Sequence, residues 1–196
     1  MKITAEVRWF LKGEYQPIEK WFLQNGKTFK NEWTEVDCYL SLEGSQSLSL
    51  KIRDRNVEMK QRTHYETFQF GNAHQGYLEH WIKWEKPLHD KSDAAQIFQD
   101  RLLEVKKERL LLFFPVQNNS VKFSETKPDE GCQAELSKVK ILNKTFTTFA
   151  FEAFGSAQNL KRYLIATSTF VFSSFDITSL MLRESLNYAT MISRYT

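Results

Sequence analysis

The sequence is poor in cysteine and has no long apolar run. Its two cysteines, Cys38 and Cys132, lie far apart and form no CxxC or other recognised metal-ligand spacing. Because so few thiols are typical of proteins in a reducing compartment, we expect a cytoplasmic protein. The longest apolar stretch, Leu164 to Phe172, includes Thr and Ser and is far shorter than the roughly 20 residues that span a bilayer. The first residues alternate polar and apolar side chains, unlike a signal peptide, and we expect no membrane contact.

Several signatures of common folds are also missing. The sequence contains no GxxxxGK[ST] and no GxGxxG, which disfavours a P-loop or a dinucleotide-binding fold. It contains no GxSxG, the turn that carries the nucleophilic serine of α/β-hydrolases. The four histidines show no HExxH or other recognised ligand spacing, and we expect them on the surface or in connections: His64, His74, His80 and His89.

The composition that is present favours one ordered domain with a small positive charge. Hydrophobic residues make up 41% of the chain and include 16 Phe, 7 Tyr and 5 Trp, whereas disordered chains are poor in such residues. A chain of 196 residues is long enough for one well-buried domain, so we expect a single domain over residues 1–196. The net charge of +3 permits nucleic acid as a partner without favouring it, and nothing in the sequence indicates an oligomeric state.

Alternating polar and apolar side chains predict that strands dominate. Residues 3–11 show this period-2 pattern, and Gly13 ends it. Residues 48–62 form two charged strands with a corner at Arg55 and Asn56, which predicts a hairpin. Further strands are expected at 37–42, 77–86, 109–114, 121–125, 132–141 and 145–154.

Helices are expected in only a few places. They are residues 17–25, 93–107 and 159–167, and a last helix that begins near Asp176 and runs toward Tyr195. This order of elements favours an α+β fold in which about eight antiparallel strands curl into a barrel or tunnel. We expect the barrel over about residues 3–155 and a C-terminal helical segment over residues 156–196.

The strands carry ordered charge opposite their apolar sides. If the apolar sides face helices and outer packing, eight charged residues share one concave surface: Glu6, Arg8, Lys51, Arg53, Lys60, Arg62, Lys83 and Glu85. Arginine and lysine hold phosphate groups, while glutamates supply the oxygen ligands that Mg²⁺ or Mn²⁺ prefers. The alternative is a solvated sheet face that carries charge for solubility alone. Recurrence of the pattern on four strands favours the concave surface for the set.

Short motifs in the same order resemble the CYTH, or triphosphate tunnel metalloenzyme, superfamily. Its opening Glu-x-Glu-x-Lys falls on residues 4–8, where Glu6 and Arg8 fit and Thr4 replaces the first acid. The C-terminal Glu-x-Glu falls on Glu135 and Ser137. Between them, similar segments lie at Asp37 to Tyr39, Leu50 to Arg53, Glu58 to Lys60, Lys83 to Glu85 and Lys107 to Arg109.

The resemblance covers roughly residues 3–155 and implies an eight-stranded tunnel for triphosphate-like anions with a divalent metal. It implies metal-dependent hydrolysis, with Glu6 and Glu85 as catalytic residues and Mg²⁺ or Mn²⁺ as the cofactor. The implied metal ligands are Glu6, Glu85, Glu135 and Glu152. The implied phosphate-binding residues are Arg8, Lys51, Arg53, Lys60, Lys83 and Arg109.

The departures from the family pattern keep a second hypothesis open. Thr4 and Ser137 remove two expected carboxylates, and the affinity of a carboxylate site falls with the number of its charged ligands. Glu152 is a candidate substitute ligand, but a carboxylate paired with a tunnel base is an equally good interpretation. The alternative is therefore a protein that catalyses nothing and binds an anionic ligand, RNA or a protein partner.

Overall fold

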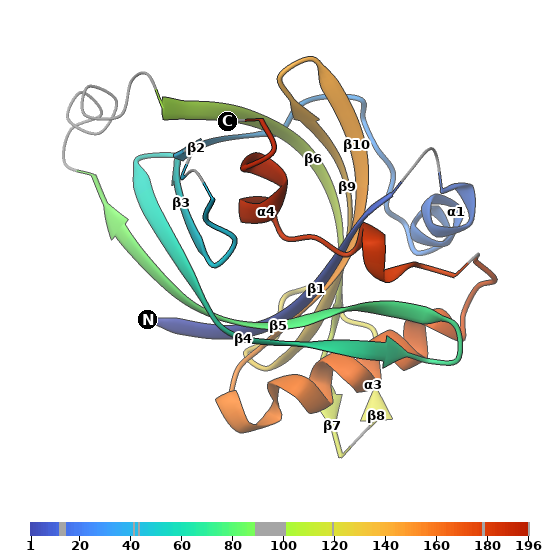
Figure 1. Ribbon diagram of the computed structural model, residues 1–196. Coiled ribbons are helices and arrows are strands. Elements are labelled where there is room, and N and C mark those ends of the chain that lie inside the picture. The colour runs from blue at the N-terminus through green and yellow to red at the C-terminus, as the bar shows by residue number, and fades with distance from the viewer. Residues whose placement is uncertain are drawn as a thin grey trace.

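The chain forms a closed antiparallel barrel, which confirms the expected fold class. The computed structural model describes residues 1–11, 15–40, 42, 44–88, 101–118, 120–177 and 179–195. Eight strands close in the order β1-β10-β9-β6-β2-β3-β4-β5 (Figure 1). They are β1 (Lys2–Leu11), β2 (Glu35–Leu40), β3 (Leu48–Arg53), β4 (Asn56–Phe70), β5 (His74–Pro87), β6 (Leu102–Phe114), β9 (Gly131–Ile141) and β10 (Lys144–Phe154).

Short elements surround the barrel. Two paired strands, β7 (Val116–Gln117) and β8 (Ser120–Val121), lie outside it. The helices are α1 (Gln16–Gln24), α3 (Leu160–Phe172) and α4 (Tyr188–Ile192), with 3-10 turns η2 (Ala157–Asn159) and η3 (Leu182–Glu184). Helices α1 and α3 lie outside the strands, whereas α4 lies at one end of the barrel between its walls (Figure 1). No helix in the described ranges has the length and apolarity that crossing a membrane requires.

The main hydrophobic core lies outside the barrel wall. The alternate residues of β1 that face outward, including Val7 and Trp9, are fully buried against α1 and α3. The Trp9 ring contacts Phe70, Phe149 and Phe172, with ring centroids 5.6 to 6.4 Å apart. Because apolar side chains take one face of each strand, the period of two places the charged residues of the other face inside the barrel.

Gly76 allows the C-terminal segment to approach the barrel wall. A Cβ atom at this position would lie 2.7 Å from Cγ2 of Val7, 2.9 Å from the Trp9 ring and 3.1 Å from Oγ of Ser185. We expect Gly76→Ala to lower the free energy of unfolding by about 1–3 kcal/mol, because the added methyl overpacks a buried contact. Urea unfolding followed by tryptophan fluorescence measures the change. A variant as stable as the wild-type protein would contradict this account of the contact.

Two helix predictions are wrong in part. Residues 89–100 lie outside the described part of the chain, but Leu102 to Lys107, expected in the same helix, belong to β6. This segment pairs with β2 on one side and reaches β9 on the other, and these ladders override its apolar helical stripe. The expected helix from Asp176 to Tyr195 is replaced, in the described residues, by irregular chain with only η3 and α4.

Other predictions are confirmed with shifted boundaries. Helix α1 matches the prediction for 17–25, and α3 extends the helix predicted at 159–167 to Phe172. The strand expected at 121–125 is reduced to β8 and a single bridge at Ser124. The corner of the charged hairpin lies one residue earlier than expected, because Asp54 and Arg55 adopt positive φ angles of 46° and 69°. Two successive residues with positive φ match the tight turn that suits the twist of a hairpin.

Candidate functional site

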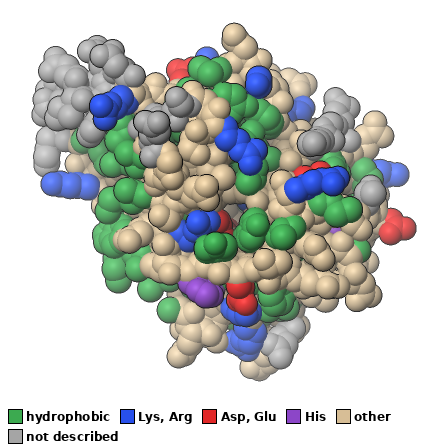
Figure 2. Space-filling view, in the orientation of Figure 1, with side chains coloured by type: hydrophobic (Ala, Val, Ile, Leu, Met, Phe, Trp, Pro, Cys, Tyr) green, Lys and Arg blue, Asp and Glu red, His purple; other side chains and the backbone are tan. Residues whose placement is uncertain are grey.

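The barrel encloses a cavity lined almost entirely by charged and polar side chains. The predicted residues that line it are Glu6, Arg8, Lys51, Arg53, Lys60, Lys83, Arg109, Glu135 and Glu152. Figure 2 shows basic and acidic side chains beside each other around a hollow near the centre of one face. Charged residues that the sequence did not single out for the site also line it: Glu58, Glu79 and Lys107.

Two of the predicted residues do not line the cavity. Glu85 lies at the rim, where its half-exposed carboxylate contacts Lys2 at 3.1 Å and Lys83 at 2.6 Å. The Lys83 and Lys2 ammonium groups lower the pKa of Glu85 to about 2. Arg62 is bound by Glu79 and lies over the Tyr65 ring, 4.4 Å from its centroid. The expectation that Glu85 joins the metal and catalytic set is therefore not met by its position.

Asp37 is the point where three basic side chains converge. Its carboxylate is fully buried and accepts from Nζ of Lys107 at 2.8 Å, Nζ of Lys51 at 3.4 Å and the guanidinium of Arg53. Burial alone would raise the pKa of Asp37, but the Arg53 hydrogen bond and the two lysine charges hold it well below its usual range. One carboxylate thus faces three cations that come from β3 and β6.

The two lysines at Asp37 differ in their partners: Lys51 also pairs with Glu58 at 3.3 Å, whereas Lys107 has no second carboxylate among the described residues. Burial lowers the pKa of Lys51 to about 8, and the neighbouring Lys107 charge contributes. Burial also lowers the pKa of Lys107 to about 8, although Asp37 opposes the shift. Nζ of Lys107 has two further neighbours, the Tyr39 hydroxyl at 3.0 Å and the Tyr188 ring, whose centroid is 3.7 Å away. Aromatic and hydroxyl groups stabilise an ammonium ion without cancelling its charge.

Glu135 organises a second group of bases. Its carboxylate accepts from Arg8 at 2.7 Å, from Arg109 at 3.5 Å and from the Ser137 hydroxyl at 2.8 Å. Burial would raise the pKa of Glu135, but the two guanidinium groups keep it well below its usual range. Ser137, which stands where the family pattern has an acid, therefore anchors Glu135 instead of adding a ligand. Arg109 also pairs with Glu35 through Nε at 2.7 Å.

Three glutamates stand in register on adjacent strands. Glu6 on β1 is opposite Glu152 on β10 and Glu79 on β5. Burial raises the pKa of Glu6, and the charges of Glu152 and Glu79 add to this while Lys60, 3.4 Å away, opposes it. Glu152 accepts from the Gln133 amide at 3.2 Å. These partners satisfy the carboxylates without a metal ion.

The arrangement does not fit the expected metal set. Within the described ranges, no three His, Cys, Asp or Glu side chains are grouped closely enough to hold a metal ion. Of the four expected ligands, Glu6 and Glu152 are neighbours in register, Glu135 is bound to Arg8 and Arg109, and Glu85 lies at the rim. Mg²⁺ or Mn²⁺ therefore stays a prediction of the resemblance.

The C-terminal segment completes one end of the site, and the sequence patterns did not indicate this role. The Tyr188 ring of α4 lies over Arg8 at 4.7 Å as well as over Lys107. The Asn187 side chain donates to Glu79 at 2.7 Å and to the Gln46 carbonyl at 3.3 Å. Asp37 carried a usable signal, since its motif lies on an expected strand, whereas Lys107 lies in a motif but at the end of a segment that was expected to be helical. Tyr188 carried none, because its contacts are with strands far away in sequence.

Comparisons with known proteins add no functional name. No family model matches the chain, and no curated protein matches it. Similar solved structures include a conserved hypothetical protein from Pyrococcus furiosus, with 14% identity, a TM-score of 0.47 and coverage of 95% of this chain and 98% of that one. Another is a protein from Pyrococcus horikoshii OT3, with 16% identity, a TM-score of 0.48 and coverage of 94% of both chains. Neither description states an activity.

Proposed function

We propose that the barrel interior binds a small polyanion of the triphosphate class, and that this binding needs no metal ion. The observation that carries the proposal is the convergence of Lys51, Arg53 and Lys107 on the single carboxylate of Asp37. Buried charges are ordinarily paired, since an uncompensated charge in a protein interior costs several kcal/mol. Lys51 and Arg53 have second carboxylate partners, Glu58 and Glu35, which other cations share, and Lys107 has none among the described residues. An anion that enters beside Asp37 would supply the negative charge that these three cations lack.

The surplus of positive charge extends along the tunnel. A continuous network of ion pairs joins seven cations through only five carboxylates, which are Asp37, Glu58, Glu35, Glu135 and Glu85. Its cations are Lys2, Arg8, Lys51, Arg53, Lys83, Lys107 and Arg109. A chain of phosphates matches such a row better than a single anion, because guanidinium groups bind phosphate oxygens in pairs and ammonium groups act as point charges.

The resemblance to the CYTH superfamily agrees with this proposal in its ligand class. The residues that resemble its phosphate-binding positions, Arg53 and Arg109 among them, point into the cavity together. Membership of that superfamily and hydrolysis of the ligand both stay predictions. Binding without turnover is the function that the contacts of the carboxylates support best, since basic side chains or amides already occupy them.

Arg53→Ala tests the proposal with little risk to the fold. The Arg53 side chain is partly exposed, and Asp37 keeps Lys51 and Lys107 as partners in the variant. We expect binding of inorganic triphosphate to weaken at least tenfold, or about 1.4 kcal/mol, in isothermal titration calorimetry. Lys2→Ala, at the 69% exposed rim position, is the matched control and should bind like the wild-type protein.

The same titrations contain the outcomes that oppose the proposal. Absence of binding to the wild-type protein, or equal affinity in Arg53→Ala, would refute the assigned site. Each titration is repeated with Mg²⁺, with Mn²⁺ and with a chelator, and phosphate release from triphosphate and ATP is followed in parallel. We expect binding in chelator and no release. Metal-dependent release would instead support the phosphohydrolase that the resemblance implies.

A further inference from the structure

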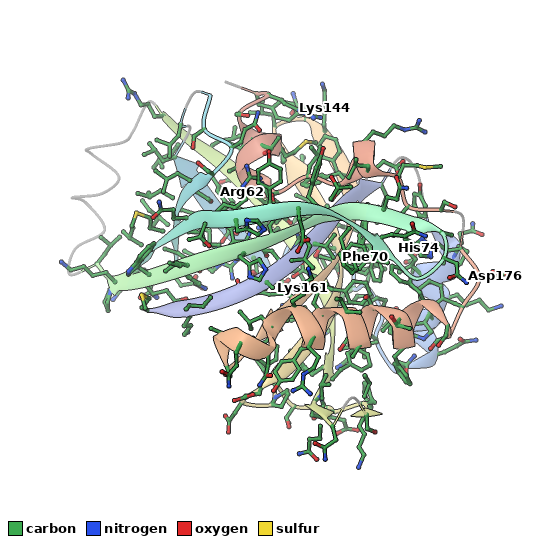
Figure 3. All side chains as sticks on the ribbon, turned by 60° about the horizontal axis from the view of Figure 1, so that its bottom comes forward. Arg62, Phe70, His74, Lys144, Lys161 and Asp176 are labelled. Atoms are coloured by element: carbon green, nitrogen blue, oxygen red, sulfur yellow. The ribbon has the colours of Figure 1, made fainter. Side chains whose placement is uncertain are left out.

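A bulge in β4 changes which side chains face outward. Arg62 is opposite Trp81 and His64 is opposite His80, so Thr63 is the extra residue between them. A bulge of this kind re-aims the side chains on either side of it. Arg62 thereby reaches Glu79 in the interior, while His64 stands exposed on the outer surface beside His80. Figure 3 places Arg62 and Lys161, which belongs to α3, on opposite sides of these strands.

The outer side of the bulge brings two imidazoles together. The rings of His64 and His80 are cross-strand neighbours with centroids 6.0 Å apart and planes inclined at 46°. A transition metal is bound about 2.0–2.1 Å from a histidine nitrogen, so two rings at this separation reach one ion with small side-chain rotations. The neutral imidazole is the form that binds a metal ion, so metal binding at this pair competes with protons.

A carboxylate lies beside the pair on the same strand. Glu66 is two residues beyond His64 and therefore on the same face of β4. Its Oε1 accepts from Nζ of Lys161 at 2.6 Å, an exposed contact that water and salt weaken. His64, His80, Glu66 and Lys161 therefore form one cluster on the outer surface of the barrel.

We propose that His64 and His80 form a binding site for a divalent transition metal of the Zn²⁺ class on the outer surface of the barrel. Glu66 does not complete a three-ligand group in the present arrangement and becomes the third ligand on leaving Lys161. Two imidazoles and a carboxylate are ligands that Zn²⁺ accepts, with water at a remaining position. This site is separate from the tunnel and does not depend on the proposed anion binding. A bound ion would join β4 to β5 at the bulge and stabilise the folded state by mass action.

The test is calorimetric titration of the full chain, free of any purification tag, with Zn²⁺ at pH 7. We expect His64→Gln to weaken binding at least tenfold, because one imidazole remains. Lys161→Met frees Glu66 and should strengthen binding severalfold, and adding Glu66→Gln to Lys161→Met should remove that gain. Cys38→Ser is the control, since it deletes a partly exposed thiol and should leave affinity unchanged.

Each arm of this experiment has a result that overturns part of the proposal. Equal Zn²⁺ affinity in His64→Gln would refute the site, and loss of binding in Cys38→Ser would move it to the thiol. No gain in Lys161→Met would refute Glu66 as a ligand. Affinity should also fall at least tenfold from pH 7 to pH 5.5, because protons compete with the metal ion for imidazole nitrogens, and a pH-independent affinity would contradict histidine ligation.

Discussion

Asp37→Asn is expected to lower the free energy of unfolding by about 3–5 kcal/mol, because it removes one partner of a buried ionic cluster. The substitution keeps the shape of the side chain but leaves Lys51, Arg53 and Lys107 around a neutral amide. The pKa of Asp37 is depressed in the folded state, so its stabilising contribution is complete above its unfolded value. That contribution is lost as the pH falls through the lower folded value.

Urea unfolding at pH 7 and low ionic strength measures this loss, since an uncharged denaturant does not screen the cluster. Glu85→Gln is the matched control, because it removes a carboxylate whose side chain is 40% exposed at the rim. Glu85→Gln should lower the free energy of unfolding by at most about 1 kcal/mol. If the anion proposal holds, inorganic triphosphate should stabilise Asp37→Asn more than the wild-type protein. Equal stability of Asp37→Asn and the wild-type protein would contradict the role given to this carboxylate.

Affinity for triphosphate is expected to fall at least tenfold between pH 8 and pH 9. The pKa of both Lys51 and Lys107 is about 8 in the free protein, so both are mainly charged at pH 7 and mainly neutral at pH 9. An anion binds the charged form, so it raises these pKa values and takes up protons on binding. Each lysine that must be protonated weakens binding about tenfold per pH unit above its pKa.

Titration calorimetry in two buffers of different ionisation enthalpy counts the protons taken up at pH 8. Lys107→Arg is the control, because a guanidinium stays charged through this range and should reduce both the uptake and the pH dependence. Without ligand, stability responds to pH in the opposite direction from affinity. The unfolded chain, with a lysine pKa near 10.5, binds more protons than the folded protein between pH 8 and pH 10.5, so stability should rise across that range. An affinity for triphosphate that does not depend on pH, without proton uptake on binding, would exclude these lysines from the site.

Much of the barrel was predictable because its strands alternate cleanly. The alternation of polar and apolar side chains in β1 holds as far as Trp9, where Phe10 interrupts it, and the two strands of the β3–β4 hairpin show charge at every second position. The helix predicted at 93–107 was wrong for its last six residues. Leu102 to Lys107 contain side chains that suit either a helix or a strand, and pairing with β2 decided between them.

The candidate site was predictable in its lining and not in its contacts. Glu6, Arg8 and Arg53 were placed in the interior by alternation and lie there. Glu85 was placed with them, but it belongs to the outer end of a strand that extends to Pro87, so its side chain reaches the rim. Alternation assigns a face to a residue and does not give its height along the barrel axis.

The sequence by itself determined that charged side chains face one side of the strands and apolar side chains the other, because the two-residue period of a strand is a property of the backbone. Only the tertiary structure decided which charges meet. Asp37 and Lys107 are separated by 70 residues, and their contact depends on the register between β2 and β6. Tyr188 reaches the same lysine from the C-terminal segment. Electrostatic partners are set by distances between atoms, and separation along the chain does not constrain those distances once the barrel has closed.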